Sequence, residues 1–245
     1  MNGEPGLGEQ ALSKIAEVGI TSQLDEVEEL NIDIRTDPIK AIQGEVDSVA
    51  IEGKGMVIQQ DLRMEKIEVK TDTVSIDPLS VVFGNIELTQ PTNADARILL
   101  KATDLNRALS SDYLRPKLKN LKLQVQEKLI TIDIQQVELS LPGEGKLSMC
   151  AEFLVRETGE VKQVSAIVVP QLKKNQQQIS LEILSFEGHG VTHELANTLI
   201  EQLMKLLDLK NFDVPGMSLQ LKEFEVEKDQ LVLHATTKID QIPSS

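Results

Sequence analysis

Three histidines and one cysteine are the residues of this 245-residue chain that could ligate a transition metal alongside its carboxylates. His189 and His193 stand four residues apart, which is the spacing of two ligands on one helical face. His189, however, lies between Gly188 and Gly190, where no helix is predicted. His234 alternates with apolar neighbours, so we place it on the polar face of a strand. We therefore expect no metal site and no bound cofactor.

The motifs that position nucleophiles or phosphates are missing from the sequence. There is no G-x-S-x-G elbow, and Gly145-Lys146 lacks the earlier glycine of a phosphate-binding loop because residue 140 is a serine. Gly53-Lys54-Gly55 lacks the third glycine of a dinucleotide fingerprint, and we expect a turn or bulge between strands there. The carboxylates of residues 25–29 form a run typical of a solvated surface. We expect no enzyme on these grounds; a lipid esterase would need a serine brought close to His193 by the fold.

The composition predicts an aliphatic interior. Hydrophobic residues make up 40% of the chain and aromatic residues only 2%, with no tryptophan, so Leu, Ile and Val must line the core. A chain of this length buries a substantial core. An aliphatic interior suits flexible acyl chains, although it is more commonly the core of a β-rich protein that binds no ligand.

The formal charge of -14 is unevenly distributed. Residues 1–100 hold 19 acidic and 8 basic residues, which makes nucleic acid an unexpected partner. The one basic segment covers residues 107–128, where six basic residues stand against two acidic ones.

The sequence shows no export signal and no apolar run of about 18 residues. As written, it predicts a cytoplasmic or peripheral membrane protein, or a periplasmic one if a leader has been removed. Cys150 stands alone and cannot form an internal disulfide.

One phrase occurs twice in the first hundred residues, as Asp37 to Gly44 and as Asp77 to Gly84. In each copy Asp can accept hydrogen bonds from the first turn of a helix, Pro has a helical φ already, and Gly can end the turn. Each copy therefore predicts a strand, a short helical turn and a strand. The apolar positions match, which predicts that the same face is buried twice: Ile39 with Leu79, Ala41 with Val81, and Ile42 with Val82.

The remaining pattern predicts a sheet-dominated α+β fold. An apolar stripe predicts a helix over residues 8–24, and Thr103 is expected to cap a second helix that ends near Pro116. Thr192 is expected to cap the longest helix, and a closing hairpin should turn across Glu227 to Gln230. Alternating apolar residues predict antiparallel strands over residues 30–34, 49–51, 67–69, 74–76, 86–88, 96–100, 121–125, 130–134, 137–141, 147–155, 164–168, 179–183, 219–226 and 231–235.

Two stretches, LNIDIRTDPIKAIQGEVDSVAIEGKGMV and FGNIELTQPTNADARILLKATDLNRAL, resemble the LmeA-like phospholipid-binding family, particularly its cyanobacterial members. The resemblance implies a tubular lipid-binding-like fold, in which a strongly curved antiparallel sheet wraps a long amphipathic helix and leaves an apolar groove. It implies no catalytic residue. On this basis we expect an amino-terminal helix and acidic linker over residues 1–29, followed by one lipid-binding-like domain over 30–245 with halves 30–120 and 121–245.

Together these inferences predict non-catalytic binding of phospholipid or another acyl lipid, with reversible membrane association and a role in lipid carriage or membrane maintenance. The predicted groove is lined by Leu195, Leu199, Ile200, Leu203, Leu206, Leu207, Ile132, Phe153 and Ile183. The predicted contacts with lipid headgroups are Arg107, Tyr113, Arg115, Lys117, Lys119 and Lys122. The alternative is a structural adaptor whose groove holds the apolar helix of a protein partner.

Overall fold

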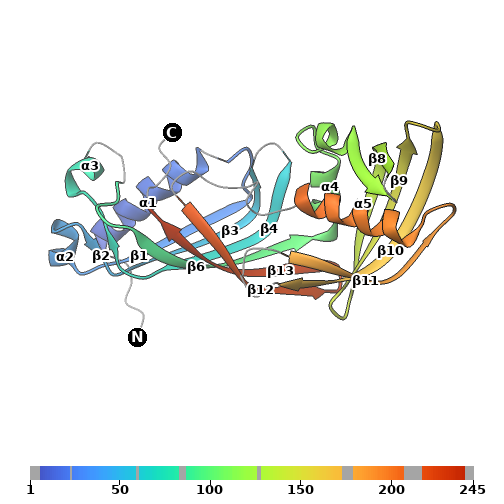
Figure 1. Ribbon diagram of the computed structural model, residues 1–245. Helices are drawn as coiled ribbons and strands as arrows, with labels where there is room; N and C mark the ends of the chain where they lie inside the picture. Colours follow the sequence, from blue (N-terminus) through green and yellow to red (C-terminus); the bar gives the residue numbers. More distant parts are fainter. Residues whose placement is uncertain are drawn as a thin grey trace.

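Two antiparallel sheets lie end to end in the computed structural model (Figure 1). It describes residues 6–22, 24–58, 61–82, 87–125, 128–172, 179–206 and 217–240. The first sheet has the order β1 (Glu29–Arg35), β3 (Ser48–Ile58), β4 (Leu62–Thr71), β6 (Thr92–Lys101), β13 (Gln230–Ile239) and β12 (Met217–Glu227). The second has the order β11 (Ile179–Gly188), β10 (Glu160–Leu172), β9 (Lys146–Val155), β8 (Lys128–Gly143) and β7 (Leu121–Val125). The predicted α+β class with a dominant antiparallel sheet is confirmed.

Few helices accompany the sheets. They are α1 (Leu7–Thr21), α2 (Pro38–Ile42), α3 (Pro78–Val82), α4 (Ala102–Leu109), the 3-10 helix η1 (Arg115–Leu118) and α5 (His193–Leu206). Helix α1 contacts β1 of the first sheet, and α5 contacts the second sheet, which curls into a half-barrel (Figure 1). A short pair, β2 (Glu45–Val46) and β5 (Val74–Ser75), joins the two copies of the repeated phrase.

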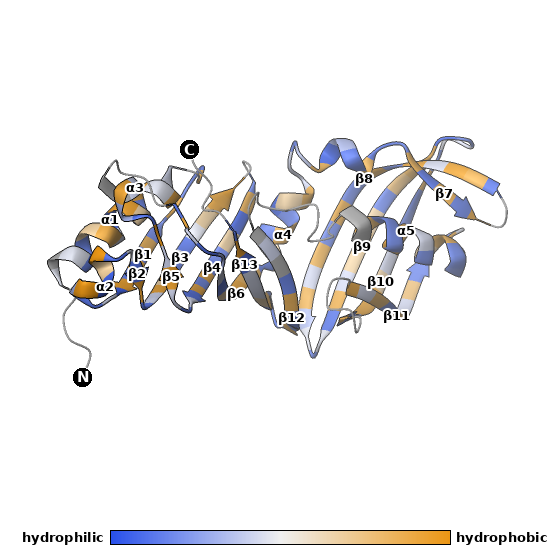
Figure 2. Ribbon diagram, turned by 60° about the vertical axis from the view of Figure 1, so that its left-hand side comes forward, coloured by the Kyte–Doolittle hydropathy of each residue, from blue (hydrophilic) through white to orange (hydrophobic). Residues whose placement is uncertain are grey.

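Period-two alternation decides which face of each strand is buried. Along β9 every second residue is buried, from Leu147 to Val155, and the residues between them are half-buried. Figure 2 shows the resulting alternation of hydrophobic and hydrophilic residues along the strands. The segments predicted as two strands over residues 130–141 form the single strand β8, with a register shift between Ile134 and Gln136. A bulge of this kind bends a strand, which helps the second sheet to curl.

The two sheets meet through the tips of two hairpins. The turn between β12 and β13 contacts the turn between β8 and β9, where the Asp229 N–H donates to the Leu141 carbonyl at 2.8 Å and the Gly145 N–H donates to the Val226 carbonyl at 3.2 Å. The predicted closing hairpin is confirmed, with Glu227 opposite Gln230. Because this hairpin pairs with β6, the last strands of the chain complete the first sheet. The two sheets therefore do not correspond to consecutive halves of the sequence, and the domain boundaries stay a prediction.

Helix α4 also ties the sheets together. The Asn106 side chain accepts the Leu139 N–H at 2.7 Å and donates to the Leu139 carbonyl at 2.8 Å, which fixes α4 to β8. At the start of α4, Asp104 accepts the Lys101 N–H at 3.2 Å and pairs with Arg63 of β4 at 3.2 Å. Asp104 is only 6% exposed, so Arg63 supplies the counter-charge that a buried carboxylate needs.

Several sequence-based expectations were wrong in detail. The helix begins at Ala102 with Asp104 at its start, so Thr103 is not its cap. It ends at Leu109, and Pro116 lies inside η1 instead of marking that end. Gly53-Lys54-Gly55 lies within β3 and is not a turn between strands. The predicted buried face of the repeat is exposed at Ile39, Ile42 and Leu79 and half-buried at Ala41, while the side chains of Val81 and Val82 lie outside the described part.

Candidate functional site

The interior of the half-barrel belongs to the larger of the two hydrophobic clusters in the described structure. Phe153 of β9 and Ile132 of β8 are 0% exposed, and they belong to one hydrophobic cluster with the buried residues of α5. Ile183 of β11 is half-buried and packs against the same cluster. The structure therefore brings together sequence-predicted groove residues from three strands and one helix.

Helix α5 forms because its start is capped and one of its faces is apolar. The Thr192 hydroxyl accepts the Leu195 N–H at 3.2 Å, which confirms the predicted cap. Leu199 and Leu203 are 1% and 2% exposed, and Ala196 is fully buried. The predicted stripe residues Leu195, Leu199, Ile200 and Leu203 are all buried in the cluster, whereas the Leu206 side chain and all of Leu207 lie outside the described part.

The position of α5 makes it the closing element of the half-barrel. The edge strands of the second sheet are β7 and β11, and α5 contacts both of them. Figure 1 shows α5 lying across the open side of the half-barrel. Residues of α4, η1, β12 and β13 belong to the same buried cluster. Aliphatic side chains fill that interior, so a ligand can enter only if α5 or those side chains move.

The chemistry of this interior is uniform. The buried polar side chains of the described residues are Thr71, Ser80, Thr92, Asp104, Ser111 and Thr237, and none belongs to β8, β9, β10, β11 or α5. An interior without a buried polar side chain can hold hydrocarbon, but it cannot offer a partner to a charged headgroup.

His189 lies in the segment that connects β11 to α5, and His193 lies at the start of α5. Gly190 has a φ of 66°, which favours glycine, and its carbonyl accepts a hydrogen bond from Lys162 at 2.9 Å. His193 is the first residue of α5, and its ring packs edge-on against Phe186 with the ring centres 5.0 Å apart. His189 lies in the exposed turn before the helix. The two rings therefore stand on different local structures, as the sequence predicted.

The predicted headgroup residues lie around α4, η1 and β7. Lys117 stands over the ring of Tyr113, 3.7 Å from its centre, and Tyr113 is 38% exposed. Arg107 pairs with Asp61 at 3.2 Å, so part of its charge is already neutralised. The other three, Arg115, Lys119 and Lys122, are exposed.

Asp133 of β8 is a carboxylate close to these basic residues, since Lys119 is among the charges that lower its pKa. Asp133 accepts hydrogen bonds from the Arg156 guanidinium at 2.8 Å and from the Asn120 N–H at 2.7 Å. Both contacts hold the pKa of Asp133 below its usual value, with Arg156 the larger cause. Arg156 is therefore the main partner of this carboxylate, and Lys119 contributes a weaker electrostatic interaction.

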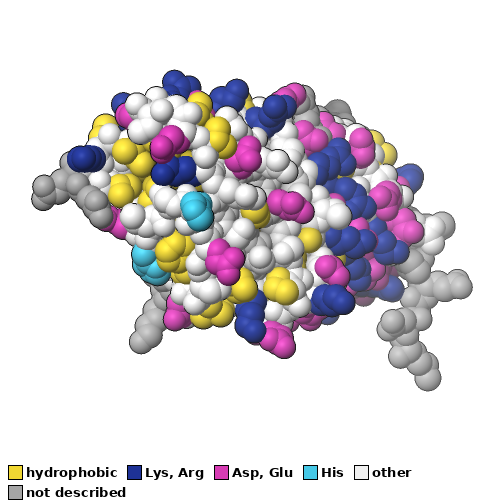
Figure 3. Space-filling model, turned by 90° about the vertical axis from the view of Figure 1, so that its right-hand side faces the viewer, with side chains coloured by type: hydrophobic (Ala, Val, Ile, Leu, Met, Phe, Trp, Pro, Cys, Tyr) yellow, Lys and Arg dark blue, Asp and Glu magenta, His cyan; other side chains and the backbone are white. Residues whose placement is uncertain are grey.

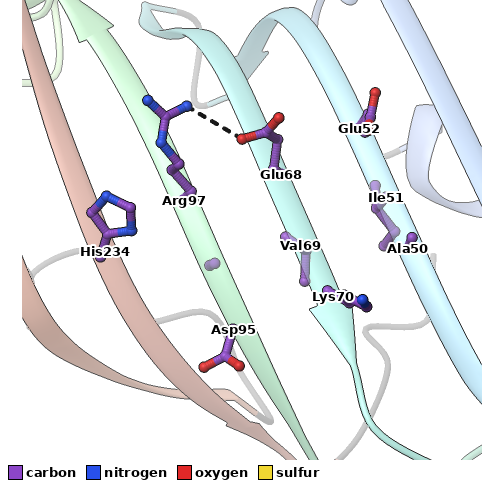
Figure 4. A pocket seen from close by; sticks show the side chains of 10 residues that line it. Ala50, Ile51, Glu52, Glu68, Val69, Lys70, Asp95, Arg97 and His234 are labelled. Atoms are coloured by element: carbon purple, nitrogen blue, oxygen red, sulfur yellow. Dashed lines mark hydrogen bonds and ion pairs between the residues drawn. The ribbon is translucent and has the colours of Figure 1, made fainter.

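A separate hollow of about 270 Å³ lies on the first sheet (Figure 4). Arg97 of β6 donates to Glu68 of β4 at 3.2 Å, and His234 and Asp95 lie beside them. Hydrogen bonds from Lys66 and then Arg97 hold the pKa of the Glu68 carboxyl below its usual value. The prediction that His234 lies on the polar face is confirmed. Because charged groups of both signs line this hollow, it is unsuited to an acyl chain.

His234 also lies near two carboxylates that the sequence analysis did not connect with it. The possible ligand atoms of Glu223, Glu225 and His234 lie within 4.8 Å of one another, which would allow them to hold a cation. Both glutamates are exposed. Glu223 and His234 become neighbours only through the pairing of β12 with β13, which the spacing in the sequence does not reveal.

A second network that the sequence analysis missed centres on Arg63. This guanidinium contacts Glu65 at 2.7 Å, Glu28 at 2.8 Å and Asp104 at 3.2 Å. The Glu65 and Glu28 contacts raise the pKa of Arg63, and the contacts from Lys101 and then Arg63 lower the pKa of Glu65. The network joins β4 to α4 and is structural in character, because every group in it is paired.

Exposed apolar side chains on the half-barrel are dispersed. Figure 3 looks onto that end of the molecule, where hydrophobic side chains are interspersed with charged and polar ones. The exposed large apolar residues on the strands of the half-barrel are Leu129, Val161, Ile167 and Leu184, each between 39% and 57% exposed, and Leu184 lies at the register shift beside Ile167. Within the described residues, no helix is long and apolar enough to cross a membrane.

Comparison with known proteins identifies one family. The model of the LmeA-like phospholipid-binding family matches residues 4–236, nearly the whole chain. No curated protein and no solved structure matches the sequence.

Proposed function

Since the chain belongs to the LmeA-like phospholipid-binding family, we propose that it binds the acyl chains of a phospholipid or related lipid, without catalysis, between α5 and the half-barrel. The observation that carries this proposal is the position of α5 across both edge strands, over an interior with no buried polar side chain among its described residues. An outward movement of α5 would then expose this apolar interior to hydrocarbon. The arrangement would correspond to the tubular type of lipid-binding fold.

Because the interior is packed, an acyl chain can enter only by taking the place of side chains that now fill it. Leu199 and Leu203 belong to the same buried cluster as Phe153 and Ile132, and the acyl chain would take their place in it. Displacing α5 outward by rotation about Gly190 would open this space from one end while the sheet keeps its hydrogen bonds. The lipid would then cover the same apolar surfaces that α5 covers in this structure.

The energetics favour reversible binding. About fifteen buried methylenes at roughly 0.8 kcal/mol each give about 12 kcal/mol of gross transfer free energy. A bilayer offers the same hydrocarbon chain a nearly equal gain, so the net preference for the protein is small. A protein of this kind takes up and releases lipid, which suits carriage of lipid or maintenance of a membrane.

The headgroup would remain outside, near the basic residues of η1 and β7. Each exposed basic residue contributes about 1 kcal/mol near an anionic surface. Lys117→Glu, Lys119→Glu and Lys122→Glu together should therefore weaken cosedimentation with vesicles of an anionic phospholipid. Unchanged cosedimentation would exclude these residues from the membrane contact.

Native mass spectrometry of the purified protein, followed by solvent extraction, tests the proposal. We expect a bound mass that matches phospholipid. Replacing buried Leu199 or Leu203 by a charged residue would unfold the protein. A test variant and a control that change only side-chain volume are therefore preferable. Ile183→Trp adds volume inside the half-barrel, and the matched change Ile167→Trp adds it to the outer face of β10, where Ile167 is 39% exposed.

The two variants give opposite expectations for bound lipid. Lipid should decrease in Ile183→Trp and persist in Ile167→Trp, provided that circular dichroism shows both to be folded. A wild-type protein that carries no lipid and takes none from vesicles would contradict the proposal and favour the adaptor, which binds the helix of a partner.

A further inference from the structure

The most exposed large apolar side chains of the described structure lie on the two copies of the repeated phrase. Ile39 and Ile42 of α2 are 69% and 79% exposed, and Leu79 of α3 is 70% exposed. Both helices lie at the end of the molecule farthest from the half-barrel (Figures 1 and 2). We call these three side chains the apolar tip. The two helices adjoin where Gly44, which follows α2, lies against Pro78, the first residue of α3. Exposed aliphatic residues on adjoining elements indicate a contact surface.

The apolar tip is held in a fixed geometry. Asp37 accepts the Ile39 N–H at 2.8 Å, and Asp77 accepts the Leu79 N–H at 2.9 Å, so both short helices are capped. Between them the Ile76 N–H donates to the Gly44 carbonyl at 2.7 Å. Gly44 has a φ of 79°, and a Cβ there would stand 2.2 Å from the Ile76 carbonyl oxygen. Only glycine allows the two copies to approach this closely. The close approach fixes the position of the two short helices, on which the exposed side chains lie.

Carboxylates surround the apolar tip. The short helices and their flanking residues carry five of them and two basic residues, Lys40, which pairs with Asp47, and Arg35, which pairs with Asp33. The five are Asp37, Glu45, Asp47, Asp77 and Glu87. This charge disfavours contact with an anionic membrane or with the same tip of another molecule. It calls for a partner surface that combines apolar side chains with basic ones.

The chain itself carries such a surface around η1 and β7. Arg115, Lys117, Lys119 and Lys122 are exposed, and none of them forms a direct ion pair with a carboxylate of the described residues, although Lys119 is close enough to Asp133 to help lower its pKa. Tyr113 at 38% and Leu129 at 57% exposure supply the apolar contacts. Leu129 stands opposite Gln124 and Lys122 opposite Thr131 in the pairing of β7 with β8, so Leu129 and Lys122 share one face of the sheet. We call these six side chains the basic surface.

We propose that the apolar tip of one molecule docks on the basic surface of a second copy of this chain. The two surfaces differ, so the contact is heterologous, and each molecule keeps one unused tip and one unused basic surface. Assembly is therefore open-ended and grows with protein concentration. It is weakened by salt, because opposite charges face each other. The inference does not depend on lipid in the half-barrel, although anionic vesicles would compete for the basic surface.

Two double variants test the two surfaces of the contact one at a time. The tip variant carries Ile42→Glu and Leu79→Glu, and the basic-surface variant carries Lys117→Glu and Lys122→Glu; all four positions are exposed, so the fold is expected to persist. Removing two apolar contacts should weaken self-association at least about tenfold. Leu184→Glu, at a 52% exposed position on β11, is the matched control.

Sedimentation equilibrium in low salt gives the deciding result. Wild type and the control should exceed the 27.1 kDa of the single chain as concentration rises, and each variant alone should remain at that mass. An equimolar mixture of the two variants retains one intact tip and one intact basic surface, so it should stop at twice the mass of the chain. A monomeric wild type, a basic-surface variant that still assembles, or a mixture that stays monomeric would each overturn the proposal. The lipid content of the tip variant, measured by native mass spectrometry, tests the proposed function separately.

Discussion

Phe153→Ala tests whether closely packed side chains fill the interior of the half-barrel. Phe153 is 0% exposed and lies in the cluster that α5 covers, so the change removes a complete aromatic ring from a packed interior. Truncations of this kind lower the free energy of unfolding by about 3–5 kcal/mol. For a chain of this size that corresponds to a fall in Tm of about 6–20 °C.

Urea denaturation followed by circular dichroism measures this loss. Ile167→Ala on the outer face of β10 is the control, because that side chain is 39% exposed and its removal should change stability by less than about 1 kcal/mol. Excess phospholipid should restore part of the stability of Phe153→Ala, since the cavity offers room for hydrocarbon. A loss below about 1 kcal/mol in Phe153→Ala would refute the closed, packed interior from which the function is argued.

Three further changes test the remaining structure. Gly44→Ala should lower the free energy of unfolding by about 1–3 kcal/mol in a urea titration, because the new Cβ would meet the Ile76 carbonyl at 2.2 Å. Asn106→Ala should lower it by a similar amount, about 1–3 kcal/mol, because both backbone groups of Leu139 lose their partner. The pKa of Glu65 is lowered in the folded state, so its stabilisation is present above the unfolded value of about 4.3 and is lost as pH falls below it. Thermal unfolding between pH 7 and pH 3 should therefore show a smaller acid-induced loss in Glu65→Gln than in wild type.

Each of these predictions has a matched control at an open position. Gly8→Ala introduces a Cβ with no atom within 4 Å, and it should leave stability unchanged or raise it slightly. Asn93→Ala removes an exposed amide and is the control for Asn106→Ala, so it should leave the free energy of unfolding nearly unchanged. Glu52→Gln removes an exposed carboxylate and should leave the acid-induced loss as it is in wild type. Equal effects in a control and in its test variant would contradict the structural reason given for that variant.

Patterns that repeat over several residues predicted the sheets well. The alternation from Leu147 to Val155 identifies β9 and its buried face, and the stripe from Leu195 to Leu203 identifies the buried face of α5. Burial on one side of an element imposes such a period, so the sequence retains it. Sequence resemblance identified the family, which the match over residues 4–236 confirms.

Local motifs were less informative about exposure. Ile39 and Leu79 are apolar residues in matching turns, which is the pattern of a buried face, yet both are exposed. A helix of five residues is too short for its apolar pattern to show which of its faces is buried. Asn106 and Arg63 also escaped prediction, because their partners Leu139 and Asp104 become neighbours only after the sheets and α4 have assembled.

Photo-crosslinking with a phospholipid that carries a diazirine at the end of an acyl chain tests the central claim most directly. The account predicts adducts on peptides that face the interior of the half-barrel, from α5 and from the strands of Ile132 and Phe153, and competition by unmodified phospholipid. Adducts confined to outward-facing positions such as Ile167 and Leu184, or labelling that excess lipid does not reduce, would contradict it.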